Sequence, residues 1–112
     1  MRFCLKKKIK ILNYLINPIT IKEFIKKLEH FINLKNSKYV CVSAVHGAVE
    51  SVFNKKYKLA HDKADIAVPD GRPIYWALKL LGNPKVDHLP GYFVANEICK
   101  LANIKKYKIG IY

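Results

Sequence analysis

Arginine and acidic residues are scarce in this sequence. Its 112 residues include 21 lysines and arginines against 8 aspartates and glutamates, a formal net charge of +13, yet only Arg2 and Arg72 are arginines. The planar guanidinium group is best suited to reading base edges, so this shortage argues against sequence-specific recognition of nucleic acid. A lysine-rich surface is either simply solvated, with no special partner, or attracts phosphate groups and anionic lipid, and the second alternative predicts peripheral contact with an anionic membrane surface.

Cysteines and long apolar runs are also few. Cys4, Cys41 and Cys99 are odd in number, lie far apart and form no CxxC pair with nearby histidines, so we expect reduced thiols. We predict no metal site and no cofactor for this chain. No uncharged stretch approaches the ~18–20 apolar residues that cross a bilayer. The basic amino terminus lacks the cleavage pattern of a signal peptide. The predicted location is cytoplasmic, peripheral on the inner face of the plasma membrane.

Apolar residues make up 51% of the chain, enough to form the core of one domain. Their spacing predicts helices that alternate with short buried strands, which is typical of a parallel sheet. The fold class expected is therefore α/β, a Rossmann-like parallel sheet with flanking helices, incomplete at the C-terminus. The predicted elements are a strand or hairpin over 8–16, a helix from Thr20, strands over 39–45, 65–68 and 107–112, and helices over 47–63, 73–81 and 92–103.

Two details of this pattern are specific. Thr20 and Glu23 have the spacing of a capping box, in which a hydroxyl and a carboxylate each satisfy a free N–H at a helix start. The run from Tyr39 to Val45 is apolar and β-branched apart from Ser43, as expected of a strand covered on both faces. On the helix after Pro73, we expect Trp76 to pack into the core rather than to stack on a sugar.

Polar side chains follow two of the predicted strands. Ser43 and His46 end the first strand, and Asp70 and Arg72 lie at a Pro-Asp-Gly-Arg-Pro corner after the second. Ligands of open α/β sheets bind beyond the carboxyl ends of the strands, so these four side chains would line one crevice if the strands are parallel neighbours. Asp70 could then accept a proton from a hydroxyl group or hold a ligand. The alternative is that Asp70 only caps the helix that starts near Arg72.

The runs VSAVHGAVES and ADIAVPDGRPIYWALKLLG, the later Gly91 and a final KIGIY carry a family resemblance. In this order they resemble the amino-terminal half of the WecG/TagA/CpsF glycosyltransferases, bacterial enzymes of cell-envelope polysaccharide synthesis. The resemblance spans 39–112, the part with βα units and the Asp-Gly corner. Residues 1–38 agree with the family only in their outline, a strand followed by a helix that leads into the βα units. The resemblance of the two segments implies that 1–112 is a single, partial glycosyltransferase domain.

The resemblance implies an inverting transfer without a required metal. The donor is a UDP-sugar, the sugar is of the N-acetylmannosamine type or related to it, and the acceptor is linked to undecaprenyl pyrophosphate. By the same resemblance Asp70 is the catalytic base and Ser43 the strand-end hydroxyl of the substrate site. His88 stands three positions before Gly91, where many members have a basic residue. His46 follows the position at which many members have an asparagine, and Arg72 could hold a phosphate, so both are further candidates for substrate binding.

The family domain continues past Lys108 with a glycine-rich turn and further βα units that complete the nucleotide site. We therefore expect a truncated polypeptide with little or no transferase activity on its own. The alternative function is a small basic module that binds phosphate, lipid or nucleic acid without catalysis, and salt-dependent binding unaffected by a change at Asp70 would favour it. The free edge of the final strand leaves pairing with a second copy open, which would give a homo-oligomer.

Overall fold

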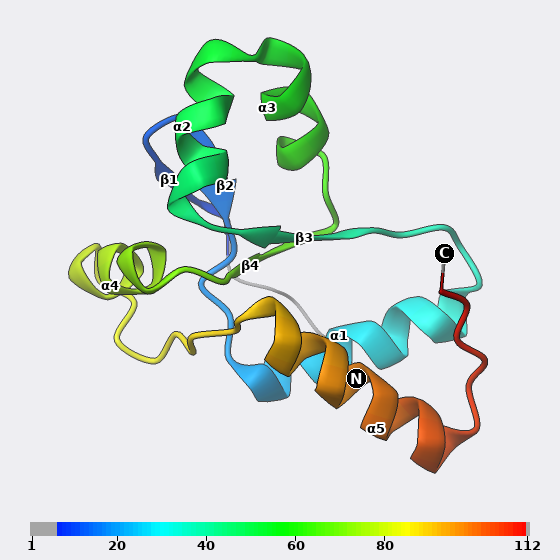
Figure 1. Ribbon diagram of the computed structural model, residues 1–112. Coiled ribbons are helices and arrows are strands. Elements are labelled where there is room, and N and C mark those ends of the chain that lie inside the picture. Colours follow the sequence, from blue (N-terminus) through cyan, green and yellow to red (C-terminus); the bar gives the residue numbers. More distant parts are fainter. Residues whose placement is uncertain (1–6, 112) are drawn as a thin grey trace.

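The computed structural model describes residues 7–111 (Figure 1). They form an antiparallel hairpin, a parallel two-stranded sheet and five helices, so the predicted α/β, Rossmann-like class is confirmed. Arg2, Cys4 and Tyr112, which the sequence analysis used, lie outside the described residues. The elements are β1 (Ile9–Ile11), β2 (Tyr14–Ile16), α1 (Ile21–Leu34), β3 (Val40–Ser43), α2 (Val45–Phe53), α3 (Lys55–Asp62), β4 (Ile66–Pro69), α4 (Arg72–Leu80) and α5 (Gly91–Lys105).

The predicted capping box begins α1. The Thr20 hydroxyl accepts a hydrogen bond from the Glu23 N–H at 3.2 Å, and the Glu23 carboxylate accepts one from the Thr20 N–H at 3.2 Å. The helix ends at Leu34, and Lys35 then takes a left-handed conformation with φ 57°. Both donors at the helix start are thus satisfied by residues only three positions apart, and the prediction is confirmed.

The parallel sheet consists of β3 and β4. Val40 lies opposite Ile66 and Ser43 opposite Pro69. All four residues of β4 are buried, but Val42 of β3 is 44% exposed. The expectation that β3 is covered on both faces is therefore wrong. Within the described residues β3 has a strand on one side only, so its other edge lies open.

Helices cover the two faces of this sheet (Figure 1). The hairpin, α2 and α3 lie on one face, α1 and α5 lie on the other, and α4 extends from the carboxyl end of β4. The buried side chains form one cluster on each side. The first contains Tyr14, Ile16, Ala48, Ile74, Leu78 and Val86, and the second contains Ile19, Phe24, Ile66, Val68, Leu89 and Val94.

Asn17 takes the place of a strand on the other edge of β4. Its backbone N–H donates to the Ala67 carbonyl at 2.9 Å, and its side-chain Oδ1 accepts from the Ala67 N–H at 2.8 Å. Asn17 is buried, so water cannot replace either hydrogen bond. One residue therefore satisfies both backbone groups of Ala67.

Asn17→Ala is expected to destabilise the protein by about 1–3 kcal/mol, because it leaves the buried Ala67 N–H without an acceptor. Urea unfolding at neutral pH measures the change. Asn96→Ala on the exposed face of α5 is the matched control, with an expected change within about 0.5 kcal/mol. Equal losses in the two variants would show that Asn17 does not support β4.

Three local predictions are wrong. Residues 107–111 form no strand, because no neighbouring strand pairs with them in the structure. Trp76 is 55% exposed, since it lies on the face of α4 opposite Ile74 and Leu78, which point into the core. The first helix after β3 begins at Val45 rather than at Gly47, so His46 belongs to its first turn.

Candidate active site

The Asp-Gly corner packs directly on the end of β3. The Asp70 N–H donates to the Ser43 carbonyl at 2.9 Å, which extends the parallel pairing one residue beyond β4. Gly71 follows so closely that a Cβ there would lie 3.4 Å from the Cβ of Ala44. The corner is therefore held against the carboxyl edge of the sheet, where α/β proteins bind ligands.

The Asp70 carboxylate is held by one of its two oxygens. Oδ1 accepts a hydrogen bond of 3.0 Å from the N–H of Gly91, the first residue of α5. A helix N-terminus favours a negative group, so this contact orients the carboxylate electrostatically as well. Within residues 7–111, Oδ2 has no hydrogen-bond partner, and the residue is half-buried. One oxygen is thus anchored and the other is available for chemistry.

The alternative that Asp70 caps the next helix is wrong. Gly71 stands at the N-cap of α4, and no side chain caps that helix. Asp70 instead contacts the start of α5, 21 residues further along the chain. The carboxylate joins the sheet to a distant helix rather than beginning the adjacent one.

His88 supports the corner from the loop before α5. Its Nε2 is hydrogen-bonded to the Asp70 main-chain carbonyl, and because a carbonyl only accepts, this nitrogen carries the proton. The ring also packs at a tilt against Tyr75 of α4, with centroids 5.7 Å apart. The Nε2 of His88 is therefore committed to positioning Asp70, which leaves Nδ1 as the ring nitrogen for any ligand.

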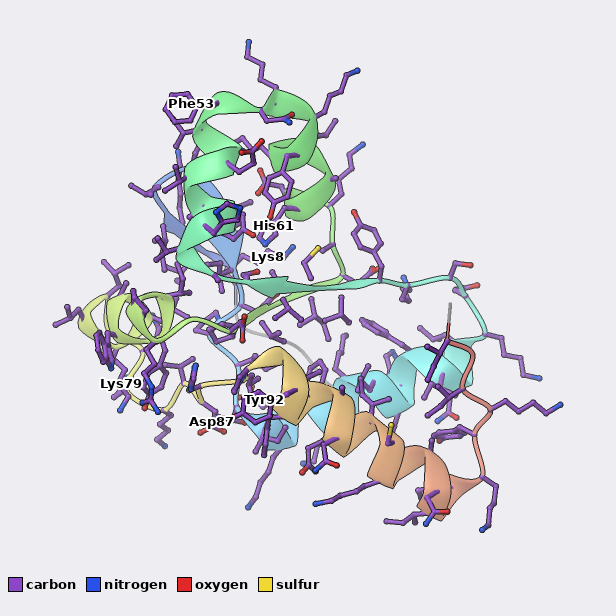
Figure 2. The ribbon with its side chains drawn as sticks, viewed as in Figure 1. Lys8, Phe53, His61, Lys79, Asp87 and Tyr92 are labelled. Atoms are coloured by element: carbon purple, nitrogen blue, oxygen red, sulfur yellow. The ribbon has the colours of Figure 1, made fainter. Side chains whose placement is uncertain are left out.

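Ser43 does not point to this corner. Its side chain is fully buried, and its Oγ lies 2.6 Å from Nε2 of His61 in α3. The His61 ring stacks on Tyr14 with centroids 3.5 Å apart, on the side of the sheet that carries α2 and α3 (Figure 2). The expectation that Ser43 lines one crevice with the other three side chains is wrong, because its hydroxyl pairs with His61 instead.

His61 is a buried polar residue that the sequence analysis missed. Only 3% of it is exposed, and its Nδ1 has no hydrogen-bond partner. Burial lowers its pKa to about 4, against a partial opposing effect of Asp62, so the ring is neutral at pH 7. Its tertiary contacts with Ser43 and Tyr14 reveal it.

His46 and Arg72 lie at the same edge as Asp70. His46 is in the first turn of α2, directly after β3, and Arg72 begins α4, directly after the corner. Both side chains are exposed. In the part of the chain that is described, neither has a hydrogen-bond or ion-pair partner, so the Arg72 guanidinium is not paired with Asp70. Its charge is available to an anionic ligand.

Three cavities of about 200, 200 and 300 Å³ lie elsewhere, two beside β3 and one on α1, and Asp70 lines none of these three. Among residues 7–111, no group of three or more histidine, cysteine, aspartate or glutamate side chains is arranged to hold a metal ion. The chemistry that the corner offers therefore comes from a carboxylate, an arginine and histidines.

The described residues thus form a helix-flanked parallel sheet with a carboxylate and an unpaired cation at its carboxyl edge, which is the edge where α/β proteins bind ligands. The model of the glycosyl transferase WecG/TagA/CpsF family matches residues 9–112. The chain belongs to this family, and the resemblance noted in the sequence is confirmed. A search of curated proteins found no significant match.

Proposed function

We propose that the domain catalyses an inverting transfer of an N-acetylmannosamine-type or related sugar from a UDP-sugar to an acceptor linked to undecaprenyl pyrophosphate. Family membership supports the glycosyl transfer, and with it a role in cell-envelope polysaccharide synthesis. The observation that carries the proposal is the Asp70 carboxylate, with Oδ1 fixed by Gly91 and Oδ2 without a partner at the carboxyl edge of the sheet. An inverting transfer needs one such base.

In the proposed reaction, Asp70 Oδ2 removes the proton of the acceptor hydroxyl. The acceptor oxygen forms a bond to the anomeric carbon from the face opposite UDP, while the bond from that carbon to the UDP oxygen breaks. The electron pair of the broken bond leaves with UDP, and the acceptor's proton stays on Asp70. Because the acceptor attacks from the face opposite UDP, the configuration at the anomeric carbon inverts. The fixed Oδ1 reduces the reorganisation that this step requires, since the carboxylate cannot turn away.

Arg72 and His46 are the proposed contacts for the departing diphosphate. A guanidinium group binds phosphate oxygens with two parallel N–H donors, and Arg72 has no competing partner among the described residues. His88 takes a different part in the proposal. The Nε2 of His88 holds the main-chain carbonyl of Asp70, so His88 positions the base. Only its Nδ1 is then left to contact the substrate.

The lipid-linked acceptor would reach the corner from a membrane surface. The net charge of +13 favours an anionic leaflet, and lysine contributes most of it. No helix within residues 7–111 is long and apolar enough to cross a bilayer. We therefore propose peripheral attachment at the inner face of the plasma membrane, driven by charge.

The experiment that tests this function measures UDP release from UDP-N-acetylmannosamine, with and without an undecaprenyl-pyrophosphate-linked acceptor. It is run on this chain and on a longer family member that carries the same Asp-Gly corner. We expect acceptor-dependent release in the longer protein and little from the 112 residues, because Asp70 lines none of the three cavities described above. Absence of release from both, together with salt-dependent nucleic-acid binding that Asp70→Asn leaves unchanged, would favour the non-catalytic basic module.

A further inference from the structure

The outer face of α4 carries large apolar side chains that the fold leaves in contact with water. Ile74 and Leu78 point into the core and are buried. On the opposite face Trp76 is 55% exposed and Leu80 is 88% exposed, and Leu81, just after the helix, is 57% exposed. Trp76 and Leu80 are four positions apart, so they lie side by side on the helix. Neighbouring exposed apolar side chains of this kind are typical of a surface that binds a partner or a membrane.

The charges of this segment are all positive. From Gly71 to Val86 the sequence contains Arg72, Lys79 and Lys85 and no aspartate or glutamate. All three cations are exposed, and Arg72 precedes Trp76 by four positions, so it lies on the same side of the helix. An apolar face bordered by cations complements an anionic lipid surface. A second copy of this chain is disfavoured there, because each copy carries a net charge of +13.

Trp76 and Lys79 are side chains suited to the boundary between lipid and water. The tryptophan ring is apolar, and its indole N–H can donate to a polar headgroup. Among residues 7–111 the indole N–H of Trp76 has no hydrogen-bond partner. A lysine buries its methylene groups along an apolar surface while its ammonium group stays with the phosphates. The outer face of α4 therefore combines the apolar, aromatic and cationic groups of a helix that lies on a membrane surface.

We propose that the outer face of α4 inserts into an anionic lipid surface, with Trp76 and Leu80 in the interfacial layer and Lys79 at the lipid phosphates. This goes beyond attachment by charge alone, which would leave Trp76 in water. α4 starts at the Asp70 corner and extends to the left end of the molecule in Figure 1. An acceptor carried by the same lipid surface would therefore arrive beside the corner.

The delivery of an acceptor rests on the proposed function, whereas the insertion of α4 does not depend on catalysis. Binding to vesicles requires neither UDP-sugar nor acceptor, and release of UDP by Asp70 chemistry requires no vesicle. Failure of the insertion and failure of the glycosyl transfer are therefore detected in separate experiments.

The fluorescence of Trp76 tests the proposal, because Trp76 is the single tryptophan of the chain. The full chain is mixed with vesicles of phosphatidylglycerol and phosphatidylcholine in equal parts, or of phosphatidylcholine alone. We expect the anionic vesicles to shift the Trp76 emission to shorter wavelength and to protect the ring from acrylamide. Lipids brominated in their acyl chains should quench it. Sedimentation of the same vesicles gives the partition coefficient.

Leu80→Ser is expected to weaken partitioning into anionic vesicles at least tenfold, because it removes a leucine side chain that leaves water on insertion. Leu59→Ser is the matched control, since Leu59 is 55% exposed but lies on α3, and partitioning should stay within about twofold of the wild type. Both leucines are exposed, so both variants should fold, and circular dichroism checks this.

Four results would overturn the proposal. The first is no binding to anionic vesicles, and the second is binding that leaves the Trp76 emission unchanged, which would assign the contact to another surface. The third is an equal loss of partitioning in Leu80→Ser and Leu59→Ser. The fourth is a shift of the Trp76 emission that develops with protein concentration in the absence of vesicles, which would assign the face to a second copy.

Discussion

Asp70→Asn is expected to lower acceptor-dependent turnover roughly 10²–10⁴-fold in a transferase that carries this corner. Asparagine has the same size, and its side-chain oxygen can still accept the hydrogen bond from the Gly91 N–H. It cannot take the proton of the acceptor hydroxyl, so only the chemical step loses its base. Initial rates of UDP release measure kcat, and thermal unfolding should change little.

Asp65→Asn is the matched control for this prediction. Asp65 is also half-buried and borders the same sheet, but it precedes β4 and accepts a hydrogen bond from the Tyr39 N–H at 3.0 Å. It therefore lies at the amino edge, away from the proposed site, and kcat should stay within about threefold of the wild type. If Asp70→Asn retained as much activity as Asp65→Asn, Asp70 would not be the base.

A fall in pH from 7 to 4 is expected to cost about 3 kcal/mol of stability through His61 alone. Burial lowers the pKa of the folded-state ring to about 4, whereas an unfolded histidine titrates near 6.5. Between these two values the unfolded chain binds a proton that the folded chain does not. The contribution is therefore fully present above about pH 6.5 and is lost as the pH falls toward 4.

Urea unfolding at several pH values between 7.5 and 4.5 measures this loss, and His61→Gln should make it smaller because the titrating ring is gone. His30→Gln is the control, since His30 is exposed on α1 and should leave the wild-type pH dependence unchanged. The two variants must be compared by the slope of stability against pH, because His61→Gln also alters the contact with Ser43. Equal slopes for His61→Gln and the wild type would contradict a neutral buried His61.

Some of the site could be predicted because its parts are adjacent in the sequence. The Asp-Gly corner follows an apolar strand and precedes a proline suited to a first helical turn, which places Asp70 at the carboxyl edge of a parallel sheet. The partners of Asp70 could not be predicted in the same way. Gly91 and His88 lie 21 and 18 residues away, and their contacts depend on where the loop after α4 returns to the sheet.

Strand propensity and apolar pattern also failed to predict which strands have neighbours, both at β3 and at residues 107–111. The run from Val40 to Ser43 and the run from Ile66 to Pro69 are similarly apolar, yet only β4 is covered on both edges, by β3 and by Asn17. Residues 107–111 have strand-forming side chains but no strand beside them in the structure. A strand forms only where another strand lies beside it, and the tertiary fold decides which segments lie side by side.

The amino-acid sequence by itself determined the α/β class, the capping box at Thr20 and the acidic corner at Asp70, because each depends on residues within a few positions of one another. Only the tertiary structure decided that Ser43 pairs with His61, that Asp70 is anchored on α5 and that one edge of β3 is open. These contacts join residues that are far apart along the chain. Their geometry follows from how whole helices and strands pack, which local side-chain patterns do not specify.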